Sequence, residues 1–168
     1  PARTRGVNAR VRADAGIGRG KAVASVFLSR MDTLVDTELT AIGTQAALSL
    51  RGKAAVAMAR VAYQRYLEIF HGEAFATLAR WGATPQYLLW ASTGVKNPDY
   101  RDLLYVEPLI GPETLNTLPD KTLAALRDHG DPVPRVTQGV AEAEAQLAEL
   151  AHPGIEEETV GNTPTGRA

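Results

Sequence analysis

The sequence contains no cysteine. Without a thiol the chain can form no disulfide, no cysteine nucleophile and no zinc–thiolate site. It also has no apolar run that approaches the roughly 20 residues of a membrane-spanning helix. Its formal net charge is only -1, which argues against a dedicated nucleic-acid or membrane-surface protein. We therefore expect neither a nucleic acid nor a membrane as a partner.

Common catalytic and metal-binding motifs are missing as well. The three histidines, His71, His129 and His152, are far apart and show no metal-ligand spacing. The glycine-rich run at 16–20 is no phosphate-binding loop, because no strand precedes it. The sequence therefore predicts no metal site.

What is present is the composition of an ordinary globular domain. The chain has 168 residues, of which 45% are hydrophobic and 22% charged. Residues 1–21 are rich in arginine and interrupted by glycines, which predicts a flexible basic arm; an arm that grips phosphate or nucleic acid is the alternative. Residues 22–151 are predicted to fold, and residues 152–168 to form a disordered tail.

Short apolar runs alternate with helical patterns along the folded part. Strands are predicted at 22–28, 86–92 and 114–117, and helices at 34–50, 53–70, 73–80, 119–128 and 138–150. Asp32 or Thr33 is predicted to cap the first helix. This order is typical of parallel β/α units. The length is nevertheless short for a complete eight-stranded β/α barrel, which needs roughly 200 residues.

Four stretches together resemble the transaldolase family, and its actinobacterial-type branch in particular. They are SVFLSRMDTLVD at 25–36, GKAAVAMARVAYQRYLEIF at 52–70, LWASTGVKNPDYRDLLYVEPLIGPETLNTLP at 89–119 and ALRDHG at 125–130. Their order and spacing match the last three β/α units of that family's barrel, and the resemblance covers roughly residues 22–130.

The resemblance implies an α/β fold, the C-terminal part (about strands six to eight) of a class I aldolase-type (β/α)8 TIM barrel, helix-rich and incomplete. It implies a cytoplasmic transferase of the pentose phosphate pathway. Members move a dihydroxyacetone unit from sedoheptulose 7-phosphate to glyceraldehyde 3-phosphate through a lysine Schiff base, and no cofactor is expected. That lysine is expected upstream of Pro1, so no catalytic residue is assigned in this chain.

The resemblance also assigns substrate-binding residues to the carboxyl ends of the strands, where barrel active sites lie. The phosphate-binding set is Arg30, Ser92 and Lys96, and the substrate-lining set is Ser25, Asn97 and Asn116. Taken on the residues alone, Arg30 could equally be a surface arginine at a helix start, and Lys96 a solvated loop lysine. An arginine can hold a phosphate through two parallel hydrogen bonds, whereas a lysine acts as a point charge.

None of the lysines in this chain suits the Schiff-base role. The amine must be neutral, which requires desolvation or a neighbouring cation. Lys96 is predicted in a loop flanked by glycine and proline, Lys21 in the arm, Lys53 on an exposed helix face and Lys121 in a first helical turn.

Two alternatives to an active transaldolase remain at this point: a non-catalytic transaldolase segment, and a helical interaction module. Three parallel strands leave two unpaired edges and lack the opposing layers of a closed barrel. We therefore expect the chain alone to be marginally stable or to self-associate through those edges.

Overall fold

The computed structural model describes residues 22–151, and the predicted arm (1–21) and tail (152–168) lie outside the described residues. The elements and their bounds are, in order, β1 (Ala22–Phe27), α2 (Leu28–Ile42), α3 (Gln45–Ser49), α4 (Ala54–Phe70), α5 (Glu73–Arg80), β2 (Gln86–Ala91), the 3₁₀ helix η1 (Glu107–Leu109), β3 (Thr114–Asn116), α6 (Asp120–His129) and α7 (Val140–Leu150). No helix of this part is long and apolar enough to cross a membrane.

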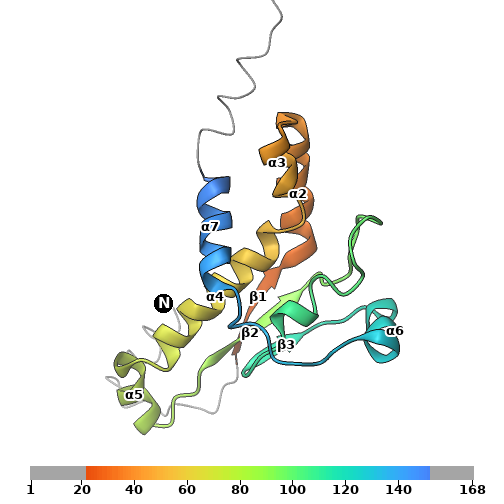
Figure 1. Ribbon diagram of the computed structural model, residues 1–168. Coiled ribbons are helices and arrows are strands. Elements are labelled where there is room, and N and C mark those ends of the chain that lie inside the picture. The colour runs from red at the N-terminus through yellow and green to blue at the C-terminus, as the bar shows by residue number, and fades with distance from the viewer. Residues whose placement is uncertain (1–21, 152–168) are drawn as a thin grey trace, which may run out of the picture.

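The three strands form one parallel sheet in the order β1-β2-β3. Parallel neighbours need a crossover connection, and here α2 to α5 lie between β1 and β2 in the sequence (Figure 1). The predicted strands are therefore confirmed, each ending one residue earlier than predicted. The alternation of strands and helices correctly predicted the parallel pairing.

One face of the sheet carries the core. The α4 helix lays Ala55, Ala59 and Tyr63 on that face, where they meet Leu88 and Trp90 of β2. The indole Nε1 of Trp90 donates a 3.0 Å hydrogen bond to the carbonyl of Leu109, so the one polar atom of this buried ring is satisfied. The α7 helix packs along α4 (Figure 1).

The opposite face of the sheet is largely bare. Side chains alternate between faces along a strand, and the residues of this second face that stay 37–46% exposed are Val23, Phe27, Tyr87 and Leu115. In a closed barrel this face would point inward against the remaining strands. The expected lack of an opposing layer is thus visible in the described residues.

Two predictions about the first helix were wrong. The pattern at 34–50 is two helices and not one, because Gly43 adopts φ 74° and ends α2, after which Thr44 caps α3 by accepting from the Ala47 N–H. The helix also begins earlier than predicted, at Leu28, with no side-chain cap. Asp32 therefore does not cap its own helix: it lies within α2 and accepts a hydrogen bond from another one.

The remaining helices follow the sequence pattern closely. The α4 and α5 helices match their predicted ranges within one residue, and α6 and α7 within two. Gly82, at φ 85°, follows the end of α5 as the expected terminating glycine.

Candidate phosphate-binding site at the carboxyl ends of the strands

The carboxyl ends of β1 and β2 lie side by side. Phe27 is paired with Ala91 in the sheet, and just beyond this pair the Ser29 N–H donates a 3.0 Å hydrogen bond to the Ser92 carbonyl. Ser92 adopts a positive φ of 54°, which turns the chain sharply away from the strand. The sequence-predicted residues Arg30 and Ser92 are thus brought to the same edge of the sheet.

Arg30 is an exposed cation at this edge. It is the third residue of α2, it is exposed, and its guanidinium carbon lies 4.9 Å from the centre of the Phe27 ring. Among residues 22–151 no carboxylate lies within ion-pairing distance of it. A cation in the first turn of a helix is not favoured by the helix dipole, so an anionic ligand would remove an unfavourable charge arrangement.

Arg30 and Ser25 line one hollow together. This hollow, of about 500 Å³, runs along the free edge of β1 and is otherwise mostly apolar, with Met31, Leu34 and Met58 in its wall. Ser25 is exposed on the bare face of the sheet. The two residues that the resemblance assigns to one strand and the helix after it are therefore close neighbours.

Lys96 and Asn97 lie in the loop that follows β2, between two other hollows. One hollow, of about 420 Å³, faces α2, and the other, of about 490 Å³, faces the start of α6. Asn97 forms a tight turn: its side-chain oxygen accepts from the Asp99 N–H at 3.0 Å, and its carbonyl from the Tyr100 N–H. None of the three hollows is lined by both Arg30 and Lys96, so their sharing of one phosphate stays a prediction.

Asn116 lies apart from the other predicted lining residues. It is in register with Trp90, on the face of the sheet that the helices cover, whereas Ser25 is on the bare face. Its side-chain oxygen Oδ1 is buried without a hydrogen-bond partner in the described part of the chain. Its role as a substrate-lining residue also stays a prediction.

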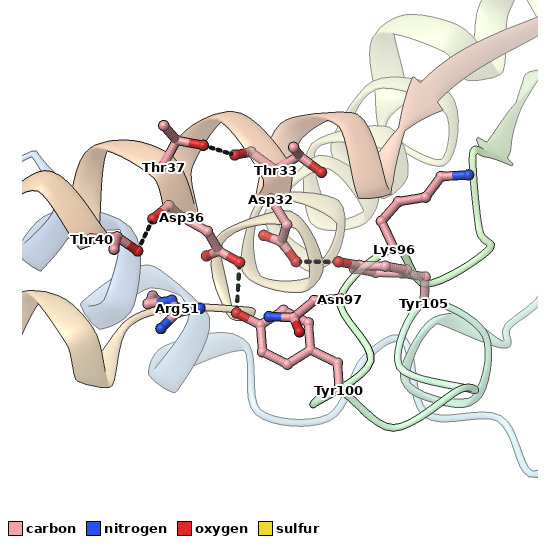
Figure 2. A pocket seen from close by; sticks show the side chains of 10 residues that line it. All are labelled: Asp32, Thr33, Asp36, Thr37, Thr40, Arg51, Lys96, Asn97, Tyr100 and Tyr105. Carbon is pink, nitrogen blue, oxygen red and sulfur yellow. Dashed lines mark hydrogen bonds between the residues drawn. The ribbon is translucent and has the colours of Figure 1, made fainter.

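The sequence analysis missed the roles of Asp32 and Asp36 in the hollow facing α2. Asp32 and Asp36 lie one turn apart on α2, and each carboxylate is hydrogen-bonded to a tyrosine, Asp32 to Tyr105 and Asp36 to Tyr100 (Figure 2). Asp32 accepts from the Ala55 N–H at 2.7 Å and from the Tyr105 hydroxyl at 2.8 Å. Asp36 accepts from the Gly52 N–H at 2.9 Å and from the Tyr100 hydroxyl at 2.6 Å.

The Asp32 carboxylate acts as a remote cap for α4, and Asp36 binds the turn just before that helix. The first N–H groups of a helix have no partner within it, and Lys53, at the cap position of α4, supplies no side-chain acceptor. Asp32 supplies one from another helix. The sequence does show two acids spaced by four residues, which places them on one helix face. It does not show that they accept from backbone N–H groups 16 and 23 residues away.

The environment sets the protonation of these groups. Burial raises the pKa of Asp32, and the hydrogen bonds from Ala55 and Tyr105 oppose that rise. Burial and the hydrogen bond to Asp36 raise the pKa of Tyr100 to about 12. The Tyr100 hydroxyl therefore keeps its proton at neutral pH and remains a hydrogen-bond donor.

The three described lysines do not provide a desolvated amine. Lys53, Lys96 and Lys121 are all exposed, and Lys21 lies outside the described residues. Burial, which is one way to make a lysine neutral and nucleophilic, is thus not available to any of the three.

Comparison with known proteins extends the resemblance to almost the whole chain. The sequence profile of the Transaldolase/Fructose-6-phosphate aldolase family matches residues 7–165. This chain belongs to that family. The "Transaldolase" of Thiobacillus denitrificans is 69% identical over 156 residues, which are 93% of this chain and 44% of the relative.

Other curated transaldolases give the same result at lower identity. The "Transaldolase" of Neisseria meningitidis serogroup C is 48% identical over 158 residues, 94% of this chain and 43% of the relative. "Transaldolase 1" of Streptomyces coelicolor is 51% identical over 134 residues, 79% of this chain and 35% of the relative. The chain thus spans less than half the length of these transaldolases, and its three-stranded parallel sheet is part of the family's β/α barrel.

Proposed function

We propose that this chain is the sugar-phosphate-binding part of a transaldolase. In the proposed reaction a lysine amine condenses with the carbonyl of sedoheptulose 7-phosphate and releases water. Cleavage of the adjacent carbon–carbon bond frees erythrose 4-phosphate. The dihydroxyacetone unit left on the lysine is then added to glyceraldehyde 3-phosphate, and hydrolysis of the new Schiff base releases fructose 6-phosphate and the free amine. The pentose phosphate pathway, a cytoplasmic location and independence from any cofactor are part of the same proposal.

The observation that carries the proposal is that Arg30, which is exposed and has no ion-pair partner among residues 22–151, lies with Ser92 at the carboxyl ends of two adjacent strands in a member of the transaldolase family. Arg30 would bind the phosphate through two parallel hydrogen bonds, the Ser92 hydroxyl would donate a third, and Lys96 would add charge. Ser25 and Asn97 would contact the sugar. The Schiff-base lysine is proposed to lie outside these 168 residues, because the three described lysines are exposed and Lys21 belongs to the predicted basic arm.

A calorimetric titration of the purified protein with fructose 6-phosphate tests the phosphate role, with unphosphorylated fructose as the matched ligand. Binding of the phosphorylated sugar alone is expected. Arg30→Ala should weaken it roughly tenfold or more, because a charge-assisted hydrogen bond contributes about 1.5–3 kcal/mol. Arg65→Ala is the control, since Arg65 is exposed on α4 and its only ion-pair partner among the described residues is Glu68. Equal affinity for both sugars would contradict the proposal.

Borohydride reduction in the presence of fructose 6-phosphate tests where the Schiff base forms. Peptide mass spectrometry should find no reduced dihydroxyacetone adduct on Lys21, Lys53, Lys96 or Lys121. An adduct on one of them would place the catalytic amine in this chain and overturn that part of the proposal.

A second candidate function, a non-catalytic segment of the family, is favoured by the bare face of the sheet. It predicts the same absence of an adduct but no preference for the phosphorylated sugar. The calorimetric titration therefore separates the two candidates.

A further inference from the structure

The loop from Ser92 to Tyr100 meets α2 at both of its ends. At the first end the Ser92 carbonyl accepts from the Ser29 N–H at 3.0 Å. At the second end the Tyr100 hydroxyl donates to Asp36 Oδ2 at 2.6 Å. Arg30 directly follows Ser29 on the same helix, so both attachments fix the loop relative to the element that carries Arg30.

The Tyr100 ring is held from a second side by Gly52. A Cβ atom added at Gly52 would lie 2.9 Å from Tyr100 Cζ, so only a glycine leaves room for the ring at this position. The Gly52 N–H also donates to Asp36 Oδ1 at 2.9 Å. Gly52, Asp36 and Tyr100 thus form a closed set in which each member contacts the other two.

A short hydrogen-bonded turn connects Tyr100 to Lys96, so fixing Tyr100 also fixes the backbone of Lys96. The Tyr100 N–H donates to the Asn97 carbonyl, and the Asp99 N–H donates to the Asn97 side chain. Lys96 is the next residue toward the strand. A lysine side chain is long and flexible, so the place where its charge can act depends on where its backbone is fixed.

We infer that Tyr100 and Asp36 are positioning residues, which hold the Lys96–Asn97 turn in place for the phosphate of the substrate. The inference rests on the proposed function. A loop that is already ordered pays less conformational entropy when it binds. Loss of the Tyr100 hydroxyl should therefore weaken phosphate binding although Tyr100 itself does not touch the ligand.

The neighbouring pair of Tyr105 and Asp32 provides a matched control. It has the same chemistry, a tyrosine hydroxyl on an α2 aspartate, but Tyr105 is 2% exposed and Asp32 1%. Tyr105 lies five residues further from the Lys96–Asn97 turn, just before η1. Its hydroxyl should matter for the stability of the fold and little for the position of Lys96.

The experiment compares Tyr100→Phe and Tyr105→Phe in the purified protein, titrated with fructose 6-phosphate by calorimetry and unfolded by heat. Tyr100→Phe is expected to raise Kd about fivefold, the cost of ordering a loosened loop. Tyr105→Phe is expected to lower the unfolding temperature more and to leave Kd within about twofold, because it loosens no ligand-binding segment. In a Tyr100→Phe, Asp36→Ala double variant, Kd should match that of Asp36→Ala alone, because the two residues act through one contact.

The variants Arg30→Ala and Lys96→Ala distinguish a failure of the positioning role from a failure of the proposed function. If both raise Kd and Tyr100→Phe does not, the positioning role is overturned and the proposed function stands. If Tyr100→Phe and Tyr105→Phe raise Kd equally, the effect is general destabilisation and the positioning role is again overturned. If neither Arg30→Ala nor Lys96→Ala changes Kd, the proposed function fails, and the inference fails with it.

Discussion

The Asp32 carboxylate of α2 accepts a 2.7 Å hydrogen bond from the backbone N–H of Ala55, in the first turn of α4. The contact joins two helices that lie next to each other in the fold (Figure 1). It satisfies an N–H that has no partner within its own helix. The second oxygen of the same carboxylate accepts from the Tyr105 hydroxyl. One buried acid therefore ties together α2, α4 and the segment that leads to η1.

Asp32→Ala should destabilise the protein by about 2–4 kcal/mol, because it leaves the Ala55 N–H and the Tyr105 hydroxyl buried without their acceptor. Asp32→Asn keeps an acceptor oxygen for Ala55 and should cost much less at neutral pH. Urea unfolding of both variants beside the wild type measures the difference. Equal losses for Ala and Asn would show that the charge, and not the hydrogen bond, holds the helices together.

The pH dependence of the same contact has a definite sign. Burial is the largest influence on Asp32 and raises its folded-state pKa above the unfolded value of 3.8. Between these two pKa values the folded state keeps a proton that the unfolded state has lost, so this group's contribution to stability falls as pH rises. The free energy of unfolding of the wild type, relative to Asp32→Asn, should therefore decrease from pH 3.8 upward. An increase over that range would mean that the hydrogen bonds outweigh burial.

Sequence patterns predicted most of the elements because their ends are marked locally. Gly82 ends α5, Pro119 precedes α6, and the apolar runs of β1 and β2 stand between polar or glycine-containing segments. The break at Gly43 was missed although glycine followed by Thr44 is a stop followed by a start. The helical periodicity on both sides of that break concealed it.

The site was predictable only in part, for a physical reason. The family resemblance assigned residues to strand ends, and the parallel register does bring Arg30 and Ser92 to one edge. The roles of Asp32 and Asp36 could not be read locally, because a carboxylate on a helix shows no preference for a particular distant N–H. Whether Lys96 and Arg30 can bind one phosphate depends on the positions of their side chains, which the spacing of residues in the sequence does not determine.

Gly52→Ala should be strongly destabilising. The new Cβ would meet the Tyr100 ring at 2.9 Å, and Gly52 has a φ of 70°, which L side chains rarely adopt. We expect a loss of about 2–4 kcal/mol from strain and overlap together.

Gly82→Ala is the matched control for this substitution. Gly82 has a similar φ of 85°, but a Cβ there would meet nothing within 4 Å. Its loss should be about 1 kcal/mol, from backbone strain alone. The difference between the two variants in chemical unfolding isolates the contact with Tyr100. Equal losses would mean that the ring moves away without cost.

Glu113 directly precedes β3, at the opposite end of the sheet from Arg30. It should make the stability of the protein sensitive to acid. Burial tends to raise its pKa, but hydrogen bonds with Tyr66 and His71 together lower it below 4.5. A lowered folded-state pKa gives stability that is present above 4.5 and is lost as pH falls through the folded value. Glu113→Gln should thus cost about 1 kcal/mol at pH 7 and less below pH 4.5. Glu68→Gln, at an exposed pair with Arg65, should change little at either pH.

Arg30→Lys tests whether the shape of the guanidinium matters as well as its charge. Lysine keeps the positive charge but cannot form two parallel hydrogen bonds to one phosphate. We expect Kd for fructose 6-phosphate to rise about tenfold, with the unfolding temperature unchanged because Arg30 is exposed and has no ion-pair partner among residues 22–151. Arg65→Lys on the exposed face of α4 should leave both quantities unchanged. If Arg30→Lys binds as tightly as the wild type, Arg30 acts as a point charge and the two-bond geometry proposed for the phosphate is wrong.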